Sequence, residues 1–462
     1  MLTIQWTPNL SVNIPNVSHQ SFFRCATLIY MDEQKVLEKE AEKNSSLQTI
    51  SKWKKFFSKK VITIFVAIAL ALLLLIVIKP QKTPPPFVSK DQANYHDNKQ
   101  GNGLFGQCEG KGTSKLNTFP LDPKDIELIV PMGRVQDSHV TPTDHQYIIP
   151  KDTKSGSLVT DNPKKYEIKA PAKGFIVNIE LFKEPVEAAY RKDPYQENYL
   201  VVFEHSCDFY TRLIHIDTLS DKVNSSFSFK NPNDQHPYAS VRIPVEEGEV
   251  IGTVGPHSFD FQIMDATVKN TDILMPENID WFSSYTVDTF DYLSAALHSQ
   301  LLQKNLRKTE PLGGKVGYDK DGTLLGNWFK VGRNKNNREE YWTNNLSIVY
   351  DHIDETQIRV SFGDFAGFPK AYGVKGNTPN PASVSSEVIK YELVKFDYHD
   401  SSGKVWDTIH YVEGLTAKNT SEMAGVVLFQ LLENRKLKVE TFPGKSASQV
   451  LGFTPNAQTY ER

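Results

Sequence analysis

Short runs of β-branched and aromatic residues, each closed by glycine, proline or aspartate, restrict the middle of this chain to β-structure. The clearest runs are Tyr166–Ile179, Tyr199–His205 and Arg242–Val254. Partly alternating apolar residues over such short lengths are typical of strands. Pro-Ala-Lys-Gly at 171–174 and Glu-Glu-Gly at 246–248 supply the glycine that a tight chain reversal needs. The stretch is therefore predicted to form the hairpins of a small β-barrel.

These hairpins resemble the duplicated hybrid motif shared by biotinyl and lipoyl carrier domains and by lysostaphin-type zinc endopeptidases. The resemblance covers about a quarter of the chain. A carrier domain places its modified lysine in Met-Lys-Met or Asp-Lys-Ala, and neither tripeptide occurs here. The segment Leu200–Ile216 is similar to the endopeptidases' strand, turn and strand that end in a catalytic histidine. The resemblance implies that His215 is the catalytic base or oxyanion donor.

The zinc ligands of that family are matched only in part. A catalytic zinc needs about three protein ligands and an open position for water. The family takes a histidine and an aspartate from an early His-x-x-x-Asp and another histidine from a late His-x-His, but Ser258 and Asp260 stand at the late motif here. The early segment offers its ligands at altered spacing. The candidate metal ligands are His139, Asp144, His145 and Asp260.

Two hypotheses follow from this incomplete set. The four candidate ligands and His215 converge as a metal or ligand site at one mouth of the barrel, or they are hydrogen-bonded strand-end residues that fix loops. Because serine replaces a histidine, we favour a non-catalytic scaffold without a cofactor, which binds a ligand, a glycan or a partner protein of the cell envelope. The alternative is a zinc hydrolase of cell-wall peptides or glycopeptides with an atypical ligand set.

An uncharged apolar run from Val61 to Ile78 predicts one membrane span. A helix of this length crosses most of a bilayer's hydrocarbon, and a buried core helix seldom lacks a polar face for so long. The lysines between positions 52 and 60 outnumber Lys79 and Lys82 on the other side. Since positive flanks stay in the cytoplasm, the chain from Pro80 onwards is expected outside. No small-residue cleavage site follows, which indicates an uncleaved signal anchor.

Charge and cysteine content narrow the function classes further. The net charge of −3 predicts no general nucleic-acid binding. The sequence has no Gly-rich phosphate loop, Gly-x-Ser-x-Gly elbow or Cys-x-x-Cys pair, so no motif supports nucleotide, serine-hydrolase or redox chemistry. Cys108 and Cys207 form a disulfide in an oxidising space, or they are two buried thiols.

The last third of the chain predicts a helix and then a second β-domain. Thr286–Leu306 keeps apolar residues at a helical period. Beyond residue 310, strand-like runs separated by turn residues predict an antiparallel barrel or sandwich. Gly326-Asn-Trp328 is similar to the Gly-x-Trp of lipocalins, whose tryptophan closes one end of the barrel. Whether this barrel is hollow enough for an apolar ligand depends on its interior side chains.

The predicted fold is thus mainly β, with a single N-terminal transmembrane helix followed by two antiparallel β-barrel or sandwich domains joined by a helix. The segment order resembles a group of prokaryotic secreted proteins that carry a peptidase-like domain without its full zinc set. The predicted segments are a cytoplasmic tail at 1–60 with Met31 as an alternative start, the span at 61–79, a linker at 80–115, the peptidase-like barrel at 116–275, a helical bridge at 276–309 and the second barrel at 310–462.

Overall fold

The structure is a computed structural model of the 462-residue chain. All described residues belong to a single compact unit. The predicted span at Val61–Ile78 lies outside the described residues. Among those that are described, no helix combines the length and apolar character needed to cross a membrane. The described residues are 103–136, 139–154, 162–185, 195–234, 236–333, 340, 343–384 and 386–462.

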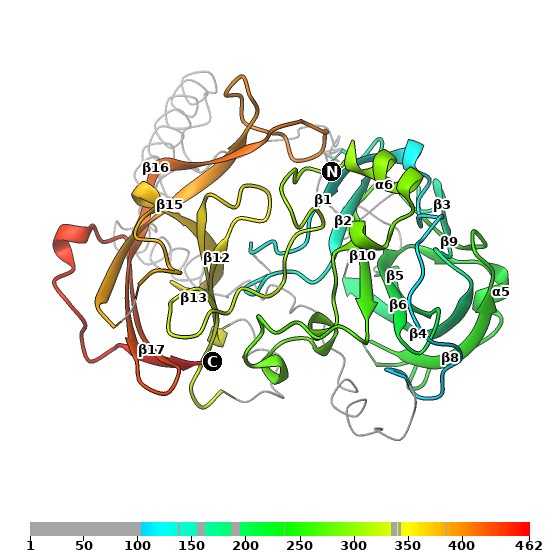
Figure 1. The fold of residues 1–462 in the computed structure, drawn as a ribbon, viewed down its shortest axis with the longest axis horizontal. Coiled ribbons are helices and arrows are strands. Elements are labelled where there is room, and N and C mark those ends of the chain that lie inside the picture. Colours follow the sequence, from blue (N-terminus) through cyan, green and yellow to red (C-terminus); the bar gives the residue numbers. More distant parts are fainter. Residues whose placement is uncertain are drawn as a thin grey trace, which may run out of the picture. The chain divides into compact units, whose positions relative to one another are not determined.

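Two antiparallel sheets form the first folded part, which we call the two-sheet part (Figure 1). The sequence predicts a small barrel here, within a fold class of barrel or sandwich domains, and these strands form two sheets because the three strands of the smaller sheet pair with one another and not with the larger sheet. The larger sheet has the order β1 (Ile126–Val130), β2 (Gln146–Pro150), β10 (Phe259–Asp265), β6 (Phe209–Ile216), β5 (Tyr195–Glu204), β4 (Gly174–Pro185) and β8 (Tyr238–Val245). The smaller sheet has the order β3 (Tyr166–Lys169), β9 (Val250–Val254) and β7 (Thr218–Leu219).

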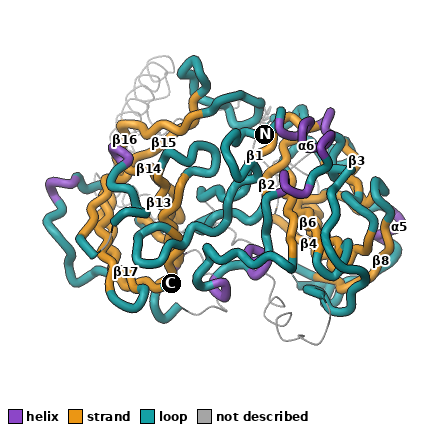
Figure 2. Tube along the Cα trace, viewed as in Figure 1, coloured by secondary structure: helices purple, strands orange, loops and turns teal. Residues whose placement is uncertain are grey.

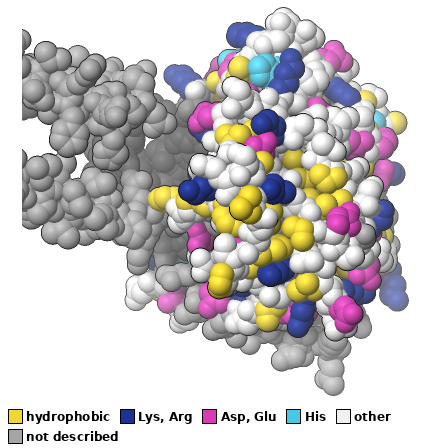
Figure 3. Space-filling model, turned by 90° about the vertical axis from the view of Figure 1, so that its left-hand side faces the viewer, with side chains coloured by type: hydrophobic (Ala, Val, Ile, Leu, Met, Phe, Trp, Pro, Cys, Tyr) yellow, Lys and Arg dark blue, Asp and Glu magenta, His cyan; other side chains and the backbone are white. Residues whose placement is uncertain are grey.

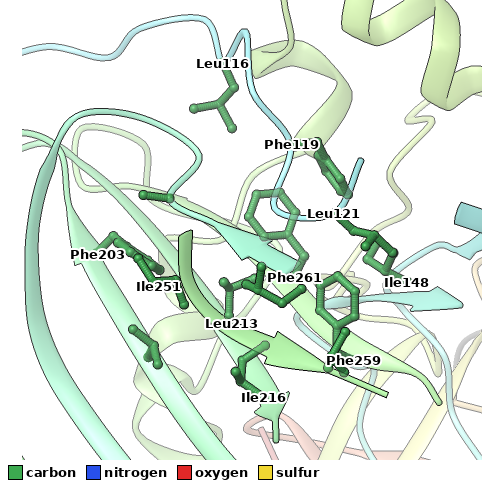
Figure 4. Close-up of a cluster of buried hydrophobic side chains, with 14 of the residues drawn as sticks. Leu116, Phe119, Leu121, Ile148, Phe203, Leu213, Ile216, Ile251, Phe259 and Phe261 are labelled. Carbon is green, nitrogen blue, oxygen red and sulfur yellow. The ribbon is translucent and has the colours of Figure 1, made fainter. Parts of the chain in front are cut away.

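One apolar core joins the two sheets (Figure 4). On β10, Phe259 and Phe261 point into this core, which also contains Ile251 of the smaller sheet. Because successive side chains of a strand alternate between faces, Asp260 lies on the opposite face of the larger sheet. The core therefore fixes which face of β10 carries the polar candidate residues.

The end of the predicted linker lies along the two-sheet part. A disulfide joins Cys108 to Cys207. Leu104 N donates a hydrogen bond to the hydroxyl of Tyr210, at 3.0 Å, and the ring of Phe105 lies 5.6 Å from that of Trp281. The segment at 103–110 is thus held by covalent, polar and apolar contacts together.

The helix predicted for Thr286–Leu306 forms only in part. The α-helix α6 spans Ala295–Leu302, and three turns of 3-10 helix precede it at Pro276–Asn278, Trp281–Ser284 and Thr289–Tyr292. Figure 2 shows these short helices separated by loops. The Asp288 side chain accepts a hydrogen bond from Phe290 N, and Leu293 is extended, so the helical ladder is broken. Side chains that bond to nearby backbone groups compete with a continuous helix in this way.

A closed eight-stranded antiparallel barrel forms the second folded part, which confirms the prediction of a mainly β chain with an antiparallel barrel. Its interior is filled by large apolar side chains, among them Trp328, Phe362, Tyr391 and Phe429. Over the face shown in Figure 3, apolar side chains are interspersed with charges of both signs. The strands are β11 (Gly326–Lys330), β12 (Asn345–Tyr350), β13 (Ile358–Phe365), β14 (Phe368–Val374), β15 (Val388–His399), β16 (Thr416–Leu432), β17 (Lys436–Pro443) and β18 (Gln458–Glu461).

A buried polar network lies beside the barrel. The Arg359 guanidinium donates to the Asp351 carboxylate at 2.8 Å, and the Tyr398 hydroxyl donates to the same carboxylate at 2.7 Å. The neighbouring imidazole of His352 is buried, and burial lowers its pKa to about 4. The folded chain therefore holds His352 in its neutral form.

The low pKa of His352 predicts a loss of stability in mild acid. The folded pKa of about 4 lies below the ordinary value of 6.5, so the unfolded chain binds more protons between these pH values. The stabilisation is present above pH 6.5 and is lost as the pH falls towards 4. We expect His352→Gln to reduce the drop in unfolding free energy between pH 7 and pH 5 by about 2 kcal/mol. Urea unfolding at both pH values measures this, and equal drops in the two proteins would contradict it.

Candidate functional site

The pairing of β10 with two neighbours brings three of the predicted site residues together. Asp260 pairs with Tyr147 of β2 on one side and with Ile214 of β6 on the other. The Nε2 atoms of His145 and His215 lie 3.3 and 3.4 Å from the same Oδ2 atom of Asp260. The sequence-predicted residues therefore meet on the face of the larger sheet that lies opposite the apolar core.

The backbone of β6 is distorted at His215. This residue has a φ of +70°, and the register between β5 and β6 shifts nearby, between Tyr199 and Val201. Left-handed backbone is costly for a residue with a Cβ and is concentrated at functional or tightly packed positions. Leu213 and Ile216 both enter the core, so the residues between them depart from strict alternation. The distortion lets His215 share a cluster with Asp260.

An arginine that the sequence did not point out completes the cluster. Arg212 on β6 donates from Nη2 to Asp144 Oδ1 at 2.9 Å, and its guanidinium lies 4.3 Å from the ring centre of Phe282. His145 donates from Nδ1 to the same oxygen at 2.8 Å, and the Ser283 hydroxyl donates to Asp144 Oδ2 at 3.2 Å. Asp144 is thus held by three partners, which makes it a positioning group.

Burial and neighbouring charges set the protonation states of this pair. Burial opposes charge on Asp144, but Arg212 and His145 outweigh it and lower the pKa of its carboxyl. Burial also opposes charge on His145, but Asp260 and Asp144 outweigh it and raise the pKa of the imidazole. The two pKa shifts both favour a charged imidazole of His145 next to carboxylates.

His139 and His215 are neutral at the edge of the cluster. Burial lowers the pKa of His139 to about 3, and its ring centre lies 5.6 Å from that of His145. Burial likewise lowers the pKa of His215. Asn198 Nδ2 donates to His215 Nδ1 at 2.8 Å, which leaves the ring proton on Nε2. His215 is partly accessible, because one fifth of its side chain is exposed.

The zinc ligands expected from the resemblance can be compared with this cluster. Among the described residues, no group of three or more His, Cys, Asp or Glu side chains is placed to hold a metal ion. A zinc-bound histidine must be neutral and must present a lone pair. In this arrangement His145 donates from Nδ1 to Asp144, and the carboxyl groups of Asp260 and Asp144 raise the pKa of its imidazole, while Asn198 Nδ2 donates to Nδ1 of His215.

A second pair of a histidine and an aspartate, His257 and Asp217, lies next to Ser258. It was not predicted from the sequence. His257 Nε2 lies 2.8 Å from Asp217 Oδ2, and His257 Nδ1 donates to the carbonyl of Ser258 at 2.9 Å. Gly255 N also donates to Asp217 Oδ2, at 2.7 Å. With both ring nitrogens engaged, His257 fixes the loop ahead of β10. Its place next to Ser258, where the family has His-x-His, is the signal that could have pointed to it.

No protein-family model matches this chain, and no curated protein matches it. The likeness to lysostaphin-type endopeptidases therefore stays a prediction based on the sequence.

The buried pair of Arg212 and Asp144 predicts a large effect of removing the cation. Arg212→Met leaves the Asp144 carboxylate buried without its guanidinium, which we expect to cost about 3 kcal/mol of unfolding free energy. Urea unfolding measures this. Arg435→Met is the matched control, because Arg435 and Asp321 form an exposed ion pair, and such pairs contribute less than about 1 kcal/mol. Equal losses in the two variants would show that the buried pair has no special role.

Proposed function

We propose that this protein is a membrane-anchored, extracytoplasmic envelope protein whose two-sheet part is a non-catalytic, peptidase-like scaffold that binds a ligand, a glycan or a partner protein. The observation that carries this proposal is the internal compensation of charge in the histidine cluster. The carboxylate of Asp144 is paired with Arg212, and the imidazole of His145 lies between Asp144 and Asp260. The Arg212 guanidinium thus supplies positive charge that a metal ion supplies in an enzyme, and the raised pKa of His145 favours a second positive charge beside it.

The missing chemistry supports the same proposal. Zinc hydrolysis needs a metal, a base and a group that stabilises the oxyanion at one place. Ser258 stands where the resemblance calls for a histidine. His215 is fixed by Asn198 on one nitrogen and faces Asp260 with the other. These residues are therefore better suited to holding the shape of the scaffold than to activating water.

The disulfide supports the extracytoplasmic location. Disulfides persist in oxidising compartments and are rare in the cytosol. Cys108 and Cys207 both follow the predicted span at Val61–Ile78, and Cys108 lies on the linker that leads away from it. A disulfide in the folded part agrees with the extracytoplasmic side that the lysine distribution predicts for it.

A zinc hydrolase of cell-wall peptides is the second candidate. It is favoured by one observation, which is that two imidazole Nε2 atoms face a single carboxylate oxygen at 3.3 and 3.4 Å. These separations exceed the usual N–H···O distance of about 3 Å. Loss of one proton from His145 and a tautomer change in His215 would turn both lone pairs towards Asp260.

Metal analysis separates the two candidates. The proposal predicts no stoichiometric zinc in the full chain purified without chelators, and a melting temperature that neither zinc nor EDTA changes. A scaffold whose charges are already paired has no tight metal site to fill. Elemental analysis and thermal unfolding measure both quantities.

One zinc ion per chain would overturn the proposal if it disappeared in both His215→Ala and Asp260→Ala. The matched control is His410→Ala, because His410 forms an exposed pair with Asp407 away from the cluster. Zinc that is lost in this control as well would be bound at the surface, and the scaffold proposal would stand.

A further inference from the structure

An open groove of about 650 Å³ lies beyond Asp265, the last residue of β10. Asp260 is near the other end of this strand. Three segments that are distant in sequence line it, namely 113–115 from the predicted linker, 268–272 after β10 and 286–292 before α6. This volume lies in the range that small-molecule sites occupy. The groove is separate from the histidine cluster, so its occupant does not depend on the chemistry of that cluster.

A fixed aromatic ring forms part of the groove wall. Tyr292 lines the groove, and its ring stacks on Phe209 with centres 5.6 Å apart and planes 16° apart. Its hydroxyl donates to Asp265 Oδ2 at 2.7 Å. Phe209 packs against the ring, and the hydroxyl bond fixes its orientation. A ring that is held in this way and lines a groove can pack against a flat apolar surface of a ligand at little entropic cost.

The polar groups around this ring are also held in place. Asp288 Oδ1 accepts hydrogen bonds from Phe290 N and Gly313 N, each at 2.9 Å. Asn270 Oδ1 accepts from Asp272 N at 3.1 Å. These contacts orient a carboxylate and an amide before any ligand arrives, so little ordering is required when one binds.

The composition of the lining excludes several ligand classes. The groove carries no net positive charge, because three aspartates balance its two lysines, Lys115 and Lys269. It therefore has no positive potential that would attract a polyanion such as nucleic acid. Among the described residues, Val268, Val287 and Tyr292 are its only apolar lining residues. The other lining residues carry hydroxyl, amide or charged groups, although apolar and polar atoms contribute similar areas to the wall. This combination matches a ligand that has many hydroxyl groups and weakly polar C–H faces.

We propose that this groove binds a short, uncharged oligosaccharide, with the Tyr292 ring stacked on one sugar and Asp288 and Asn270 bonded to its hydroxyls. The inference rests on the proposed binding function and deepens it by naming the ligand class and the place of binding. The histidine cluster takes no part in it.

Calorimetric titration of the full chain in detergent with chitotetraose and with maltotetraose tests this assignment. We expect saturable binding of at least one of them, weakened about tenfold or more in Tyr292→Ala and retained in Tyr292→Phe, which keeps the ring. Thr271→Trp fills the groove from an exposed position and should abolish binding without affecting the fold. Ser401→Trp is the matched control at an exposed serine on the barrel, and it should bind normally.

Two outcomes would overturn the assignment. The first is that neither sugar binds at millimolar concentration, and the second is that binding persists unchanged in both Tyr292→Ala and Thr271→Trp. Either result leaves the scaffold proposal intact, because that proposal depends on metal content. Conversely, stoichiometric zinc would overturn the scaffold proposal while leaving a Tyr292-dependent sugar site in place. The two proposals therefore fail in different experiments.

Discussion

The candidate site depends on the place of β10 in the larger sheet, between β2 and β6. Antiparallel pairing on both sides fixes the register of β10, and so the position of Asp260 relative to His145 and His215. The alternation of side chains along the strand then sends Phe259 and Phe261 into the core and Asp260 to the other face. A slip of one residue would exchange these faces, so the apolar core specifies the position of the polar cluster.

Burying this cluster requires compensation of its charge within the protein. An isolated carboxylate in the interior is costly, and a buried ion pair repays that cost only with good geometry and further hydrogen bonds. Asp144 meets both conditions, since Arg212, His145 and Ser283 all donate to it. In a metalloenzyme the metal ion fulfils this requirement and leaves a position for water. Here the guanidinium of Arg212 fulfils it for Asp144.

The sequence predicted the β-structure well because strand patterns and glycine turns are local signals. It also brought His145, His215 and Asp260 into one hypothesis, although they are far apart in the chain. It could not predict Arg212, whose position in an apolar strand becomes meaningful only once β6 and β10 are paired. The broken helix before α6 was missed for a related reason. The capping bonds of Asp288 involve Gly313, and the periodicity of Thr286–Leu306 carries no information about that contact.

The two ends of β10 are subject to different constraints. At the Asp260 end, the polar groups lie within ion-pairing distance of one another and are largely withdrawn from solvent. Beyond Asp265, the polar groups line an open groove and are fixed mostly by backbone contacts. Charged groups that are paired and buried stabilise a shape, whereas groups that are oriented but accessible can exchange water for a ligand. Recognition in this scaffold is therefore expected away from the position where the peptidase resemblance places its chemistry.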